Sequence, residues 1–70
     1  MMHKQTKSAR ELADLIVARI GVHELSIRVR KDHAYGWEPT VEDSPGDKIF
    51  FQRRAEEIAN RLRLDYELRD

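Results

Sequence analysis

The sequence contains no cysteine and no long apolar run, and each absence excludes a class of protein. Without cysteine, the 70-residue chain has no disulfide bridge, no thiolate metal ligand and no thiol nucleophile. No apolar stretch approaches the roughly 20 residues that span a bilayer, and residues 1–5 lack the hydrophobic stretch of a signal peptide. We therefore expect a cytoplasmic protein with no membrane partner.

The chain also lacks an excess of charge of either sign. Charged residues make up 37% of the sequence, but 13 basic residues balance 13 acidic ones. This balance gives no general attraction to nucleic acid, so such a role needs a local basic cluster. The length leaves room for one hydrophobic core, and small domains without covalent staples are candidates for oligomerisation. We assign residues 1–7 to a flexible N-terminus and residues 8–70 to a single domain.

Local signals predict a first helix that begins near Ala9 and ends at Gly21. Ser8 and Glu11 have the spacing of a capping box, in which both side chains satisfy backbone N–H groups at a helix start. Glycine after the last apolar turn can adopt the left-handed conformation that ends a helix. The predicted buried stripe consists of Ala9, Leu12, Ala13, Ile16 and Ile20.

Two stretches with apolar residues at every second position predict a β-hairpin. The first contains Leu25, Ile27 and Val29, and the second contains Tyr35, Trp37, Pro39 and Val41.

A turn centred on Asp32 places Val29 opposite Tyr35, Ile27 opposite Trp37 and Leu25 opposite Pro39, so every apolar side chain shares one face. A two-residue turn at Asp32-His33 mixes the two faces. We prefer the first register, in which Tyr35 and Trp37 belong to the core and no glycine occupies the turn.

A second helix follows the polar loop 42–47. We place Ser44 at its N-cap and Pro45 at its first position, with Asp47 as the alternative cap. Its apolar stripe contains Phe51, Ala55, Ile58, Ala59 and Leu62. Alternation in residues 64–68 suggests a short third strand. The sequence therefore predicts an α+β fold in the order α-β-β-α(-β), with two helices packed on one face of a small antiparallel sheet.

The sequence offers no pattern that points to catalysis or metal binding. Ser8 and Ser44 are assigned to helix caps, and no glycine-rich phosphate loop or His-Glu-x-x-His motif is present. His23 and His33 fall at opposite ends of one predicted strand, too far apart to share a metal ion. We predict a non-enzymatic protein without a metal, a cofactor or a catalytic residue.

Nucleic-acid binding is the alternative function, and it has one local argument. In the preferred register, Arg28 and Arg30 project from the polar face of the hairpin over small residues, and Lys31 extends this basic strip. Such a strip can hold phosphates or stack on bases, and Arg53 and Arg54 of the second helix can add to it. Nearby acidic residues and the zero net charge oppose this interpretation.

Apolar residues that lie outside the buried stripes of the two helices suggest the preferred function. Ile49 and Phe50 point away from the buried stripe of the second helix, and Leu15 lies on the flank of the first. Either the loop and Tyr66 cover Ile49 and Phe50, or these residues contact another chain. We favour a protein-protein interaction module, a homodimer or a complex with another protein, in which Ile49, Phe50, Leu15 and Trp37 form the interface.

Overall fold

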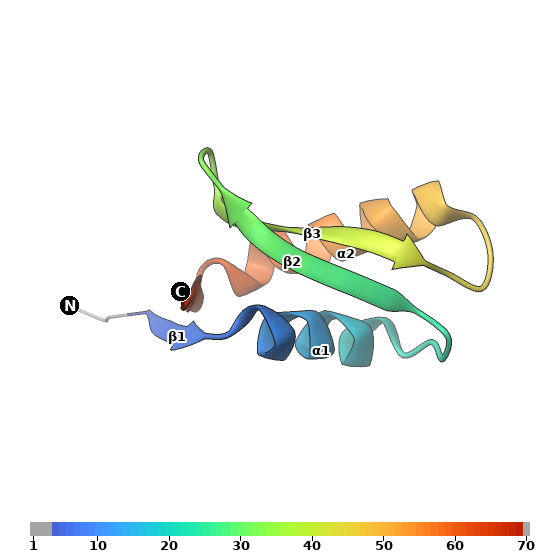
Figure 1. Cartoon of the computed structure of the whole chain (residues 1–70), viewed down its shortest axis with the longest axis horizontal. Helices are drawn as coiled ribbons and strands as arrows, with labels where there is room; N and C mark the ends of the chain where they lie inside the picture. Colours follow the sequence, from blue (N-terminus) through green and yellow to red (C-terminus); the bar gives the residue numbers. More distant parts are fainter. Residues whose placement is uncertain (1–3, 70) are drawn as a thin grey trace.

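The structure, a computed structural model, describes residues 4–69, and these form two helices and two separate two-stranded sheets (Figure 1). In chain order the elements are β1 (Gln5–Lys7), α1 (Ala9–Ile20), β2 (Ser26–Asp32), β3 (Gly36–Asp43), α2 (Lys48–Leu62) and β4 (Tyr66–Leu68). The prediction of a small α+β fold is confirmed.

Helix α1 begins and ends where its local signals predict. The Ser8 hydroxyl accepts a hydrogen bond from the Glu11 N–H at 3.1 Å, and the Glu11 carboxylate accepts one from the Ser8 N–H at 2.9 Å. Gly21 ends the helix with φ +73°, in the left-handed region, and its N–H donates to the Val17 carbonyl oxygen at 2.9 Å. The capping box and the glycine cap are therefore both present.

Strands β2 and β3 form the predicted antiparallel hairpin, but the preferred register is wrong. Val29 lies opposite Pro39 and Ile27 lies opposite Val41, and the loop consists of residues 33–35 between the paired Asp32 and Gly36. The loop needs a residue with positive φ, and Gly36 supplies it at φ +91°.

The Asp32 carboxylate holds the loop by accepting hydrogen bonds from the N–H groups of Ala34 at 3.1 Å and Tyr35 at 2.8 Å. Tyr35 therefore lies in the loop and is 67% exposed, which corrects its assignment to the core. The shift preserves the alternation of faces, so Ile27, Val29, Pro39 and Val41 still share one side of the hairpin.

The strand predicted at the chain end is present, but it does not extend the hairpin. Strand β4 pairs in parallel with β1, a strand that sequence analysis missed. The Gln5 N–H donates to the Asp65 carbonyl oxygen at 3.0 Å, and the Arg69 N–H donates to the Lys7 carbonyl oxygen at 2.7 Å. An ordered element thus occupies part of the segment 1–7 that we expected to be flexible; residues 1–3 of that segment lie outside the described residues.

Helix α2 begins later than the favoured assignment. Asp47, the alternative cap, is the N-cap, and its carboxylate accepts a hydrogen bond from the Ile49 N–H at 3.0 Å. The Ser44 hydroxyl instead donates to the Gly46 carbonyl oxygen within the loop at 2.9 Å. Ile49 and Phe50 therefore lie in the first turn of the helix.

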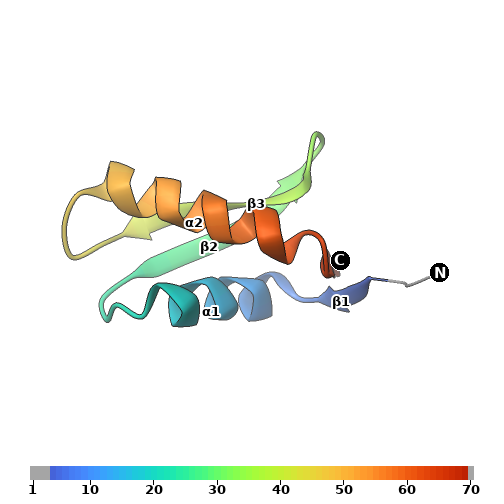
Figure 2. The ribbon, with the colours of Figure 1, turned by 180° about the vertical axis from the view of Figure 1, so that it is seen from behind.

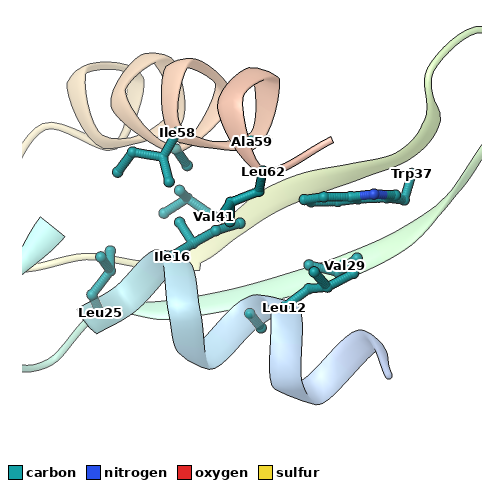
Figure 3. Packing of buried hydrophobic residues seen from close by; sticks show 11 residues of the cluster. Leu12, Ile16, Leu25, Val29, Trp37, Val41, Ile58, Ala59 and Leu62 are labelled. Carbon is teal, nitrogen blue, oxygen red and sulfur yellow. The ribbon is translucent and has the colours of Figure 1, made fainter. Parts of the chain in front are cut away.

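One hydrophobic core joins the two helices to one face of the hairpin (Figure 3). Helix α1 runs beside β2 and helix α2 runs beside β3, as the view from behind also shows (Figure 2). The fully or nearly fully buried apolar residues are Leu12, Ala13, Ile16, Leu25, Val29, Trp37, Pro39, Val41, Ala55, Ile58, Ala59 and Leu62. Both predicted helical stripes supply most of this core.

Candidate interaction surface

The side chains of Ile49 and Phe50 are exposed at the start of α2. Their exposed fractions are 71% and 61%, whereas Phe51, the next residue, is half-buried and packs against the core. Tyr66 does not cover them, since its ring lies 5.0 Å from the Lys7 ammonium group, beside β1. The alternative in which the loop and Tyr66 cover these residues is therefore wrong.

Phe50 is held against its neighbour rather than extended freely into solvent. The Phe50 and Phe51 rings meet edge to face, with centroids 5.3 Å apart and planes at 83°. This arrangement is a favoured geometry for two aromatic rings. Because Phe51 packs on the core, the Phe50 ring is supported in a defined position.

A groove of about 430 Å³ lies beside Ile49, between α2 and the edge of β3. Its lining residues are Val41, Lys48, Ile49, Gln52, Arg53 and Glu56. Val41 and Ile49 give it an apolar part, and Lys48, Arg53 and Glu56 add charges of both signs. We call Ile49, Phe50 and this groove the α2 surface.

The other two residues predicted for the interface do not join the α2 surface. Trp37 is 2% exposed, and its indole N–H donates to the Tyr66 carbonyl oxygen at 3.3 Å. Leu15 is half-buried and packs against the core. Trp37 therefore belongs to the core, and we leave both residues out of the surface.

Two exposed apolar side chains escaped the sequence analysis. Leu64 is 75% exposed just after α2. Tyr35, in the hairpin loop, contacts the Arg63 guanidinium group, whose carbon atom Cζ lies 5.1 Å from its ring centroid and 5.2 Å from that of Trp37. The Arg63 Nε–H also donates to the Trp37 carbonyl oxygen at 2.8 Å, so this arginine ties the end of α2 to the hairpin.

The predicted basic strip is interrupted by acidic residues. The observed register places Arg30 opposite Glu38 and Arg28 opposite Thr40, rather than over small residues. The Arg28 Nε atom lies 3.0 Å from a Glu42 carboxylate oxygen.

The remaining basic residues of the alternative hypothesis lie apart from this pair. Lys31 lies opposite Trp37 near the hairpin tip, whereas Arg53 and Arg54 lie on the exposed side of α2. Arg54 approaches Glu57 at 3.8 Å. The register thus does not unite these residues into one basic surface.

The most clearly perturbed carboxylate has a structural role. Hydrogen bonding to the backbone N–H and hydroxyl of Ser8 lowers the pKa of Glu11. Desolvation opposes this shift, and the charges of Arg69 and Lys7 make smaller contributions that lower the pKa further. The Arg69 Nη2 atom lies 3.1 Å from the same Glu11 carboxylate. These contacts cap the start of α1 and connect it to Arg69, the residue after β4.

Within residues 4–69, no group of three or more histidine, aspartate or glutamate side chains has an arrangement that could hold a metal ion. His23 and His33 are exposed, and His3 lies outside the described residues. In the same range, neither helix is long and apolar enough to cross a bilayer. A comparison of the chain with protein-family models, curated proteins and solved structures finds no significant match.

Proposed function

We propose that this protein is a non-enzymatic interaction module that self-associates through the α2 surface. The supporting observation is the exposure of Ile49 and Phe50 at 71% and 61%. Burial of one large apolar side chain contributes about 1.5–3 kcal/mol, and a short chain has few such residues to spare. A second chain that covers Ile49 and Phe50 recovers this free energy.

The charges beside the apolar residues suit a contact between two identical copies. In a two-fold interface, a patch meets the same patch of the second copy. Arg53 and Glu56 carry opposite charges and line the same groove, so Arg53 of one copy can approach Glu56 of the other. This complementarity supports a homodimer over an association without symmetry.

The non-enzymatic part of the proposal is supported by the engagement of two serine hydroxyls. The Ser8 hydroxyl caps α1, and the Ser44 hydroxyl donates to the Gly46 carbonyl oxygen. Neither histidine that the structure describes forms a hydrogen bond with a serine. A nucleophile paired with a base is the usual signature of covalent hydrolytic catalysis.

Sedimentation velocity over a range of concentrations tests self-association. We expect the wild type to form a dimer, and Phe50→Asp to remain monomeric because a charge replaces an apolar contact. Leu64→Asp is the matched control, since Leu64 is 75% exposed but lies at the other end of α2. A wild type that stays monomeric at high concentration, or equal loss in both variants, contradicts the proposal.

Nucleic-acid binding through Arg28, Arg30, Lys31, Arg53 and Arg54 remains the second hypothesis. It has less support because Glu38 and Glu42 lie beside the two hairpin arginines. A salt-dependent shift with an oligonucleotide that is lost in Arg28→Ala/Arg30→Ala favours this hypothesis over self-association alone.

A further inference from the structure

Side chains of α2 occupy the outer edge of the hairpin at β3. The Val41 N–H donates to the Gln52 Oε1 atom at 2.8 Å, and the Gln52 Nε2–H donates to the Pro39 carbonyl oxygen at 3.0 Å. Farther along, Arg63 donates to the Trp37 carbonyl oxygen at 2.8 Å. An edge strand normally presents such backbone groups to any incoming chain, so α2 closes this edge.

The same hydrogen bonds reveal which backbone groups of β2 point outward. In an antiparallel pair, opposed residues alternate between those that bond each other and those whose N–H and C=O groups point away. The Val41 N–H and the Pro39 C=O point away from β2, toward Gln52. Their opposed residues, Ile27 and Val29, must therefore direct their own N–H and C=O groups to the outer edge of β2.

At Ile27 and Val29, no side chain within residues 4–69 closes this second edge. Among residues 4–69, no hydrogen bond engages the outward backbone groups of Ile27 or Val29, in contrast to the two bonds that Gln52 makes on β3. The hairpin thus has one closed edge and one edge that can accept a further strand.

A groove of about 420 Å³ runs along the open edge. Both ribbon views show α1 alongside β2 (Figures 1 and 2). Residues of this helix form the other wall of the groove. The wall presents Ala9, Ala13 and Val17, and the strand side includes Ile27 and Val29. Small side chains on the helix leave space beside the strand, and alternate residues of an added strand would point toward this apolar part. Arg10, Asp14, Arg28 and Glu42 also line the groove, so it carries charges of both signs.

Charge distinguishes between the two simplest occupants of this groove, which are β2 of a second copy and an extended segment of another protein. If β2 of a second copy paired here with its faces matched, every register that uses most of the strand would place arginine opposite arginine. The opposed pairs are Arg28 with Arg28, Arg28 with Arg30, or Arg30 with Arg30. The last register also pairs Arg28 with Asp32, but it places Ile27 opposite His33, which lies outside the strand. Like charges directly opposite each other destabilise a strand pair, whereas opposite charges stabilise it.

We propose that the open edge of β2 binds an extended segment of a partner protein in which apolar residues alternate with acidic ones. The backbone of this segment pairs with Ile27 and Val29, and its apolar side chains face Ala9, Ala13 and Val17. Its carboxylates face Arg28 and Arg30 from the side opposite β3, where they compete with Glu42 and Glu38 for the two guanidinium groups. This site lies on β2 and α1, apart from Ile49 and Phe50, and it does not depend on self-association.

Amide hydrogen exchange of the wild-type protein tests the strand edge directly. In dilute protein, we expect the Ile27 and Val29 amides to exchange faster than those of Arg28 and Arg30, which bond β3. A capped peptide of alternating valine and glutamate should slow the Ile27 and Val29 amides at least about tenfold. Ile27 and Val29 amides that are already protected in the dilute protein, or that stay fast at saturating peptide, overturn the proposal.

Binding of the same peptide to charge variants tests the choice of partner. Arg28→Glu/Arg30→Glu should weaken binding about tenfold or more, since two favourable charge pairs become repulsive. Arg54→Glu/Arg61→Glu is the matched control, because both arginines are exposed on α2 outside the α2 surface, and it should bind as the wild type does. Equal binding of a valine-lysine peptide overturns the acidic specificity, and protection of Ile27 and Val29 that rises with protein concentration alone assigns the edge to a second copy instead.

Discussion

Gln52 replaces a missing neighbouring strand at β3, and its removal should destabilise the protein strongly. The substitution Gln52→Leu preserves much of the side-chain volume but removes both hydrogen bonds to the backbone of Val41 and Pro39. Val41 is 4% exposed, so water reaches its N–H poorly. Each buried backbone group left without a partner costs about 1–3 kcal/mol.

We expect the free energy of unfolding to fall by about 2–3 kcal/mol, toward the lower part of the summed range because Gln52 itself is only half-buried. For a domain of this size, that loss lowers the melting temperature by roughly 10–20 °C. Urea denaturation can be followed by the fluorescence of Trp37, the single tryptophan of the chain. With an m-value near 1 kcal/mol/M, the midpoint should fall by about 2–3 M.

Arg53→Leu is the matched control for this substitution. Arg53 is the next residue of α2 and is exposed, so its replacement should change stability by no more than about 0.5 kcal/mol. The reasoning about the β3 edge fails if Gln52→Leu costs less than about 0.5 kcal/mol or if the two variants unfold alike. A changed m-value would instead indicate an altered denatured state.

Two further substitutions test the hairpin turn and the cap of α1. Gly36→Ala should destabilise the protein by about 1–2 kcal/mol in thermal unfolding, because φ +91° is unfavourable for a residue with a Cβ atom. The added Cβ atom itself would meet no clash, since no atom outside the neighbouring residues lies within 4 Å of its position. The control Gly46→Ala, at a glycine without positive φ, should cost much less. The hydrogen bonds of Ser8 lower the pKa of Glu11 in the folded protein. The ionised carboxylate therefore stabilises the fold when the pH is above the pKa of Glu11 in the unfolded chain. This contribution is lost as the pH falls through the pKa of Glu11 in the folded protein. Unfolding at several pH values should therefore show a difference between wild type and Glu11→Gln that is constant near neutrality and shrinks below about pH 4; a difference independent of pH would contradict the role of the carboxylate charge.

Signals that act within one turn of the chain were sufficient to predict α1. Ser8, Glu11 and Gly21 each bond backbone groups a few residues away, so no distant contact can easily overrule them. The start of α2 was harder because Ser44 and Asp47 are both good caps. The helix begins after Asp47, while Ser44 bonds within the loop, and the sequence alone does not rank these two arrangements.

The register of the hairpin and strand β1 depend on contacts that local patterns do not encode. Alternation determines which face a residue occupies, but a slip by an even number of residues preserves that face. The positive φ of Gly36 selects the observed loop. Strand β1 has no apolar alternation, and its partner β4 lies at the other end of the chain, so a single sequence contains little that indicates this pairing.

The same reasons explain which residues of the candidate surface were predicted. The exposure of Ile49 and Phe50 follows from their angle on the helix, a local property. The environments of Trp37 and Tyr35 depend on the register, and the four-residue shift moved Tyr35 into the loop. The open edge of β2 could not be predicted either, because it became visible only through the bonds that Gln52 makes to β3.

Trp37 makes the two small sheets depend on each other. A two-stranded sheet is marginal on its own, and β1 and β4 pair over only three residues each. The Trp37 side chain comes from β3, lies in the core and donates to the Tyr66 carbonyl oxygen of β4 at 3.3 Å, while its own carbonyl oxygen accepts from Arg63 just after α2. Because Tyr66 and Leu68 also pack against this core, separation of β4 from β1 would expose the residue that anchors the hairpin. The parallel pair is therefore part of the same cooperative unit as the hairpin, even though the two pairs form separate sheets within the described residues.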